Sequence, residues 1–212
     1  MTATVQTENR EHGVVDAAVA LALLEAVRAH DHPGEVLEDE DLAVSLPRRL
    51  GLKGVVLSQI ERYEKAHLAG RKVPVSDLSN LLRLVLRRPD AEAILRDAGR
   101  QVARFHYERL SRVRSSMLRV MRGPFALGPV RRAARNMLRG IAGNGRPRLH
   151  GKPFVLRLPG SIAARLDPIA CVLYTGALEE LILLYTGAAR VLHHERCLAR
   201  GDDVCEWVLV TE

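Results

Sequence analysis

Aromatic residues and lysine are both scarce in this chain of 212 residues, and each shortage narrows what the protein can be. Aromatics make up only 4% of the residues, so the core must consist mainly of leucine, valine and alanine. Lysine is so rare that arginine carries almost all of the positive charge behind the net charge of +7. A basic balance permits a nucleic acid, an anionic membrane surface or an acidic partner, and does not choose among them.

The sequence also lacks a long apolar run and a leader-like segment. No stretch reaches the roughly eighteen uninterrupted apolar residues that a membrane span requires. Residues 1–13 are polar, lack the charged-then-apolar plan of a signal peptide, and are expected to form a disordered arm. We therefore predict a cytoplasmic protein without a transmembrane segment. Thiols stay reduced in that compartment, so the three cysteines indicate a metal site or core packing before a disulfide.

Motifs of the common catalytic classes are missing as well. The sequence contains no GxSxG, HExxH, Walker or GxGxxG pattern. The adjacent carboxylates Glu179 and Glu180 point apart on a helix and are typical of a solvated surface. These absences favour a protein that is not an enzyme.

Apolar periodicity predicts helices in the first part of the chain and extended segments after about residue 150. Helices are predicted over 14–30, 55–70, 75–88, 91–121, 130–143 and 169–187. Strands are predicted over 152–160, 188–200 and 204–210, the last two around a Gly201-Asp202 turn. This order is typical of an α+β fold, with an antiparallel sheet packed against helices. We expect a helical region at 14–122 and an α+β region at 123–212, forming one compact domain.

The cysteines are Cys171, Cys197 and Cys205. Cys197 and Cys205 flank the predicted hairpin turn, so their side chains can lie opposite each other on one face of the hairpin. Cys171 begins the preceding helix, whose first turn can reach the hairpin if the helix packs on the sheet. Zinc takes about four ligands and accepts thiolate or imidazole, so three cysteines need one more partner.

His193, His194 and Glu195 are the nearest candidates for that fourth ligand. His194 precedes Cys197 by three positions, so on a regular strand it would point to the opposite face unless a bulge intervenes. Ordinary core packing is a competing interpretation, because cysteine is among the most frequently buried residue types. Neither a CxxC nor an HxxxH spacing is present, and the spacing alone leaves both interpretations open.

The stretch ERCLARGDDVCEWVLV, residues 195–210, resembles the C-terminal pattern of the 4-vinyl reductase-type domain, a branch of the TRAPP-like superfamily. That pattern has a cysteine, a small residue, Gly-Asp, a second cysteine and an aromatic residue. The corresponding positions here are Cys197, Ala199, Gly201, Asp202, Cys205 and Trp207. The segment CVLYTGALEELILLYTG, residues 171–187, resembles the family's preceding helix, so the resemblance covers about residues 150–210.

This branch is similar to the sensory domains of bacterial activators that respond to phenols, which hold a structural zinc with three cysteines and one glutamate. The resemblance implies a structural zinc on Cys171, Cys197 and Cys205, with His194 in the position of the glutamate. Imidazole is an acceptable replacement for a carboxylate on zinc. The resemblance also implies a homodimer and a hydrophobic or aromatic ligand, and some relatives are linked to tetrapyrrole metabolism.

Two further groups of residues are predicted to form binding surfaces. By resemblance, a ligand pocket would lie between the sheet and the helices, lined by Phe154, Leu156, Tyr174 and Leu183, with His106 as a further candidate. Within the arginine-dense region 109–152, a basic patch is expected at Arg131, Arg132, Arg135 and Arg139. Such a patch suits an anionic surface or an acidic partner, although a merely solvated basic face is the alternative. Without a clear helix-turn-helix pair, nucleic acid is disfavoured as a partner.

These features together favour a non-enzymatic, zinc-stabilised small-molecule-binding or sensory domain that acts through a protein partner. One alternative is a TRAPP-like scaffold or adaptor whose basic face binds a protein or a membrane surface. Another is an accessory protein that handles tetrapyrroles or other hydrophobic metabolites.

Overall fold

The fold is α+β, with helices packed against two small antiparallel sheets, as the sequence predicts. The computed structural model describes residues 13–31, 54–118, 127–143, 145–150 and 154–210. Most of the arm expected at 1–13 therefore lies outside the described residues. One cluster of buried apolar side chains runs from Val15 to Trp207, through both regions expected from the sequence.

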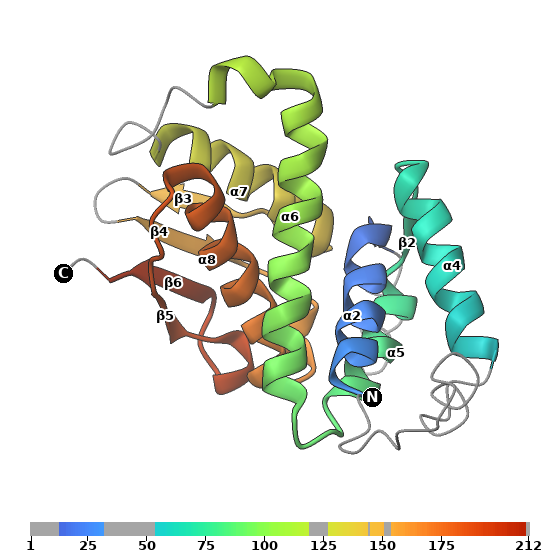
Figure 1. Ribbon diagram of the computed structural model, residues 1–212. Helices are drawn as coiled ribbons and strands as arrows, with labels where there is room; N and C mark the ends of the chain where they lie inside the picture. Colours follow the sequence, from blue (N-terminus) through green and yellow to red (C-terminus); the bar gives the residue numbers. More distant parts are fainter. Residues whose placement is uncertain (1–12, 32–53, 119–126, 144, 151–153, 211–212) are drawn as a thin grey trace, which may run out of the picture.

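Helix α6 (Ala91–Leu118) stands between two groups of elements (Figure 1). On one side lie α2 (Ala17–His30), α4 (Gly54–Leu68) and α5 (Val75–Val85). On the other side lie α7 (Leu127–Ile141), α8 (Val172–Thr186) and a four-stranded sheet. The short 3-10 helices Ala163–Arg165 and Ile169–Cys171 lead into α8.

A two-stranded sheet, whose first strand directly precedes α2 and whose second follows α4, was not predicted. Strand β1 (Val14–Asp16) pairs with β2 (Lys72–Pro74), with Val15 opposite Val73. The prediction of a helix from residue 14 is therefore wrong for its first three residues. Asp16 instead caps α2, since its Oδ1 accepts a hydrogen bond from the Ala18 N–H at 3.0 Å.

The four-stranded sheet has the order β3-β4-β6-β5, and every neighbouring pair is antiparallel. Strand β3 (Arg148–His150) was not predicted, whereas the other strands confirm the three predicted ones in shortened form. These are β4 (Val155–Leu158), β5 (Leu192–Arg196) and β6 (Cys205–Leu209). Leu156 pairs with Trp207 in the middle of the sheet, and both side chains are fully buried.

Helices α6 and α8 cross with their backbones in contact, because each has a glycine at the crossing. A Cβ atom on Gly99 of α6 would lie 2.1 Å from the Leu173 carbonyl oxygen. A Cβ atom on Gly176 of α8 would lie 2.4 Å from the Arg96 carbonyl oxygen. Any side chain at either position would push the helices apart, so the two glycines determine how closely α8 approaches α6.

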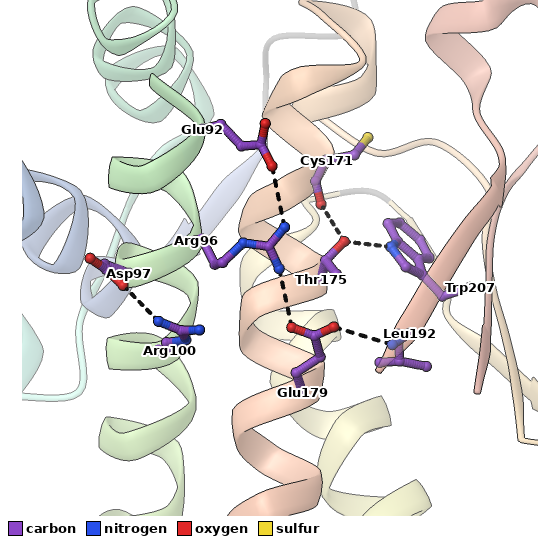
Figure 2. A network of polar contacts seen from close by, with 9 residues as sticks. All are labelled: Glu92, Arg96, Asp97, Arg100, Cys171, Thr175, Glu179, Leu192 and Trp207. Carbon is purple, nitrogen blue, oxygen red and sulfur yellow. Dashed lines mark hydrogen bonds and ion pairs between the residues drawn. The ribbon is translucent and has the colours of Figure 1, made fainter. Parts of the chain in front are cut away.

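Ionic contacts join the same two helices. Arg96 donates to Glu179 Oε2 at 3.2 Å, and Glu179 Oε1 accepts from the Leu192 N–H at 3.1 Å (Figure 2). Arg104 donates to Glu180 Oε1 at 2.8 Å, and Glu180 is only 8% exposed. The expectation that both carboxylates form a solvated surface is therefore wrong, because α6 presents an arginine to each of them.

Among the residues that the structure describes, one helical window, Ile169–Thr186, is long and apolar enough to cross a membrane by length and composition. However, 61% of that window is buried inside the structure, and a core helix of a soluble protein passes the same test. The apolar character of α8 is explained by its position between α6, α7 and the sheet.

Candidate metal centre

Three sulfur atoms and one imidazole meet where the start of α8 reaches the β5–β6 hairpin. Cys171 directly precedes α8, His194 lies in β5, Cys197 follows β5 and Cys205 begins β6. One ligand atom from each of the four residues lies within 4.8 Å of the others. The three cysteines are fully buried. Side chains from three elements thus form a cluster that could hold a metal ion.

The distances between the sulfurs suit a metal and exclude a disulfide. Cys171 Sγ lies 3.9 Å from Cys197 Sγ and 4.0 Å from Cys205 Sγ, and all three thiols are free. A disulfide would bring two sulfurs to about 2.0 Å. Two thiolates on one tetrahedral zinc, each with a Zn–S bond of about 2.3 Å, lie about 3.8 Å apart. The observed spacing is close to that value.

A β-bulge brings His194 into the cluster. His194 pairs with Trp207 and Arg196 pairs with Glu206, so Glu195 is an extra residue in strand β5. The bulge changes the alternation of side chains, and the imidazole reaches the side occupied by the sulfurs. The side chains of His193 and Glu195 are exposed and do not belong to the cluster. Of the three candidates for a fourth ligand, the structure thus places His194 among the cysteines.

His194 Nε2 is buried and has no hydrogen-bond partner among the described residues. An unpaired buried polar atom costs roughly 1–3 kcal/mol, so such atoms are rare in folded proteins. A metal ion coordinated by this nitrogen would remove that cost. Core packing explains three buried cysteines equally well, but it does not explain a buried imidazole nitrogen without a partner.

The pKa values of Cys171 and Cys205 are shifted in opposite directions. A hydrogen bond from Cys171 lowers the pKa of Cys205 below its usual value, and the Leu198 N–H and the nearby His194 imidazole lower it further, against the effect of burial. The hydrogen bond to Cys205 and burial together raise the pKa of Cys171. Three thiolates this close repel one another, so the set can lose its protons only when a cation compensates their charge.

Trp207 and Thr175 hold the ligands in place. The Trp207 ring stacks on His194 with a centroid distance of 4.4 Å and an interplanar angle of 10°. Its Nε1–H donates to Thr175 Oγ1 at 2.9 Å, and that hydroxyl donates to the Cys171 carbonyl at 3.4 Å (Figure 2). Trp207 therefore orients the imidazole of β5 and is linked to the start of α8. Sequence reasoning missed Thr175, although its spacing of four from Cys171 places the two on one helical face.

The turn between β5 and β6 completes this support. Gly201 adopts a left-handed conformation with φ of 95°, which favours glycine. Asp202 Oδ2 accepts a hydrogen bond from the Cys197 N–H at 2.6 Å. Arg200, which sequence reasoning also missed, donates to the His194 and Glu195 carbonyls, each at 3.0 Å, and so fixes the bulge. The Gly-Asp pair is thus needed both for the turn and for the position of Cys197.

The predicted pocket residues lie in different places. His106 lines a cavity bordered by α4, α6 and α7, whereas the other four do not line it. Phe154, Leu156 and Tyr174 are 3%, 0% and 0% exposed and are packed into the core, while Leu183 is 37% exposed. Trp207 and Tyr174, which meet edge to face at 6.0 Å, occupy the space between α8 and the sheet.

The predicted basic patch lies on α7. Arg132, Arg135 and Arg139 are exposed, and their spacing of three and four places them on one side of the helix. Arg131 is half-buried. Three of the four predicted arginines therefore share one solvent-facing surface.

This chain matches no known protein family, no curated protein and no solved structure. The resemblance to the 4-vinyl reductase-type domain thus depends on the residues of segments 171–187 and 195–210 alone.

Proposed function

We propose that this chain is a non-enzymatic small-molecule-binding or sensory domain that is stabilised by a structural zinc ion and acts through a protein partner. The metal part depends on one observation: three buried thiols and one ring nitrogen of His194 lie within 4.8 Å of one another. Zinc suits thiolate and imidazole ligands, and four protein ligands are typical of structural sites. A fully ligated ion leaves no position for an activated water, which argues against catalysis.

Zinc would be held by Cys171, His194, Cys197 and Cys205, and it would join the start of α8 to both strands of the hairpin. Trp207 and Asp202 would then act on the ligands, the first by orienting the imidazole and the second by positioning Cys197. The resemblance supports two remaining parts of the proposal, a hydrophobic or aromatic ligand and a homodimer.

Native mass spectrometry of freshly purified protein tests this proposal. We expect one zinc per chain, a dimeric mass and, when the ligand survives purification, an additional small molecule. A metal-free native mass would contradict the structural zinc. A zinc-loaded chain that stays monomeric would contradict only the homodimer.

Two matched variants test the fourth ligand. His194→Ala is expected to lose zinc, because among the described residues His194 provides the only imidazole of the cluster. His193→Ala, one residue away and exposed, is expected to keep one zinc per chain. His194→Glu restores an oxygen ligand and should retain zinc. Loss of zinc from His193→Ala but not from His194→Ala would transfer the role to His193.

The exposed arginines of α7 favour a second candidate function, that of a TRAPP-like scaffold binding a protein or membrane surface. Arg132, Arg135 and Arg139 give α7 a basic surface that could meet an acidic partner. Binding through this surface should weaken as salt rises. Partner binding that is unaffected by salt and by the triple glutamine substitution of these arginines would remove this candidate.

A further inference from the structure

A cavity of about 360 Å³ lies where β1 and the start of α2 meet α4, α6 and α7. Its apolar floor is formed by Val102 of α6 with Met137 and Ile141 of α7, each only 2% exposed. Its polar wall includes His67 of α4 with His106 and Arg109 of α6. The volume lies in the range of small-molecule sites, about 300–1,000 Å³.

The polar wall carries two imidazole nitrogens that lack partners. His67 Nδ1 and His106 Nε2 are both buried without a hydrogen bond in the part of the chain that the structure describes. The nearest acid to His67 Nδ1 is Asp16, whose Oδ1 is 3.9 Å away and instead caps α2. That distance is too long for a hydrogen bond. Both nitrogens thus lack a partner within the described residues, and both belong to residues that line the cavity.

This wall is not a second metal centre. Among the described residues, the only group with metal-ligand spacing is the cysteine cluster. The two imidazoles are accompanied instead by a guanidinium. Arg109 is 62% exposed, and its Nη1 lies 3.9 Å from Asp16 Oδ2, so its donors can turn toward a ligand. His106 and Arg109 are three residues apart on α6 and therefore share a face.

The hydrogen-bond donors on this wall suit an anionic head group. Asp16, which also lines the cavity, lies 3.9 Å from Arg109, and burial lowers the pKa of His106. A carboxylate can accept hydrogen bonds from the guanidinium and from either imidazole, and its charge favours protonation of that imidazole. The apolar floor requires a hydrocarbon body behind the head group.

We propose that this cavity binds a small carboxylic acid with an apolar body, the carboxylate on His67, His106 and Arg109 and the body on Val102, Met137 and Ile141. This inference rests on the proposed function, in which the domain binds a small molecule. It adds a site and a chemical class for that molecule. It does not require the metal, which lies at the other side of α8.

Octanoate provides the test, with 1-octanol as its neutral counterpart. Full-length protein carrying ¹³C-labelled methionine methyl groups is titrated with each compound, and its zinc content is measured on the same sample. The Met137 methyl resonance, assigned with Met137→Leu, reports the cavity floor. We expect a saturable shift with octanoate, and an affinity for 1-octanol weaker by about tenfold or more, as the loss of a charge-assisted hydrogen bond predicts.

Arg109→Gln should weaken octanoate binding by about tenfold. Arg83→Gln is the control, since it makes the same charge change at an exposed position on α5 outside the cavity lining. Equal binding of octanoate and 1-octanol would overturn the carboxylate class, and equal effects of the two arginine variants would overturn the site. No Met137 shift in zinc-loaded protein overturns this inference but leaves the zinc proposal intact. Octanoate binding to metal-free protein would support the inference while contradicting the zinc.

Discussion

The two sides of α6 differ in whether the polar side chains next to them have hydrogen-bond or ion-pair partners. On the side of α8, Arg96 and Arg104 pair with Glu179 and Glu180, and glycines bring the two backbones into contact. Toward α4 and the start of α2, a cavity that α7 also lines remains, and two histidines that border it each have a ring nitrogen without a partner among the described residues. One side is closed by the chain itself, and the other leaves space and hydrogen-bonding capacity for something else.

This difference indicates that the contacts between α6 and α8 serve stability, whereas the cavity serves binding. Well-paired polar groups and close backbone contact stabilise a unique arrangement of elements. An unpaired buried nitrogen lowers stability unless a ligand, a water or an ion contacts it. We therefore expect substitutions on the α8 side to destabilise the protein strongly, and polar-to-apolar substitutions in the cavity to be tolerated.

The largest effect is expected from Cys197→Ser, which removes one of the four candidate metal ligands. Loss of the metal should lower the free energy of unfolding by more than about 4 kcal/mol, a size reached only by a few mechanisms, including metal loss. Urea denaturation followed by circular dichroism measures it. A chelator should destabilise the native protein to a similar extent and leave the variant unchanged. A chelator that destabilises both proteins equally would contradict the metal clamp.

Gly176→Ala should come next, with a loss of about 3 kcal/mol. Its Cβ atom would lie 2.4 Å from the Arg96 carbonyl oxygen, so α8 must move away from α6. Gly128→Ala is the matched control, because a Cβ atom on that helical glycine meets nothing within 4 Å. The control should leave the melting temperature nearly unchanged. Equal melting temperatures for the two variants would show that the helix crossing tolerates a side chain.

Asp202→Ala should have an intermediate effect at the hairpin. It removes the acceptor of the Cys197 N–H and should cost about 1–2 kcal/mol, with a zinc affinity lower by about tenfold. Competition with a chromogenic chelator measures the affinity. Asp203→Ala, the neighbouring residue, removes only an exposed ion pair with Arg196 and should change little. If Asp203→Ala weakens zinc as much, charge alone accounts for the effect.

The smallest effect, of opposite sign, is expected on the cavity side. His106→Leu removes an unpaired buried nitrogen and should stabilise the ligand-free protein by about 1 kcal/mol. His30→Leu serves as its control, because His30 does have a partner, Asp97 at 2.9 Å, and should lose stability. Urea denaturation of both variants gives the sign directly. A destabilised His106→Leu would erase the difference between the two sides of α6.

The C-terminal part of the fold was predictable because its signals are local. The Gly201-Asp202 turn, the apolar run of α8 and the spacing of the cysteines all act within a few dozen residues. The requirement for a bulge also followed from strand geometry, and the structure has that bulge between His194 and Arg196. The binding of a metal at this cluster, and the identity of that metal, stay predictions.

The features that could not be predicted from the sequence depend on contacts between segments that are distant along the chain. Strands β1 and β2 have three residues each and are specified by pairing with each other, so no alternating pattern reveals them. Glu179 appeared solvated because nothing near it in sequence shows that Arg96 faces it. The cavity is formed by α4, α6 and α7 together, and only His106 among the predicted pocket residues borders it.

The cysteine cluster also has a consequence for the order of folding. Its sulfurs come from positions at most 34 residues apart, whereas the ion pairs between α6 and α8 join residues 83 and 76 positions apart. Closing the shorter loop costs less chain entropy, and local contacts form faster than distant ones. We therefore expect the hairpin and the start of α8 to assemble first, with metal capture preceding the docking of α6. Zinc should then accelerate refolding as well as slow unfolding.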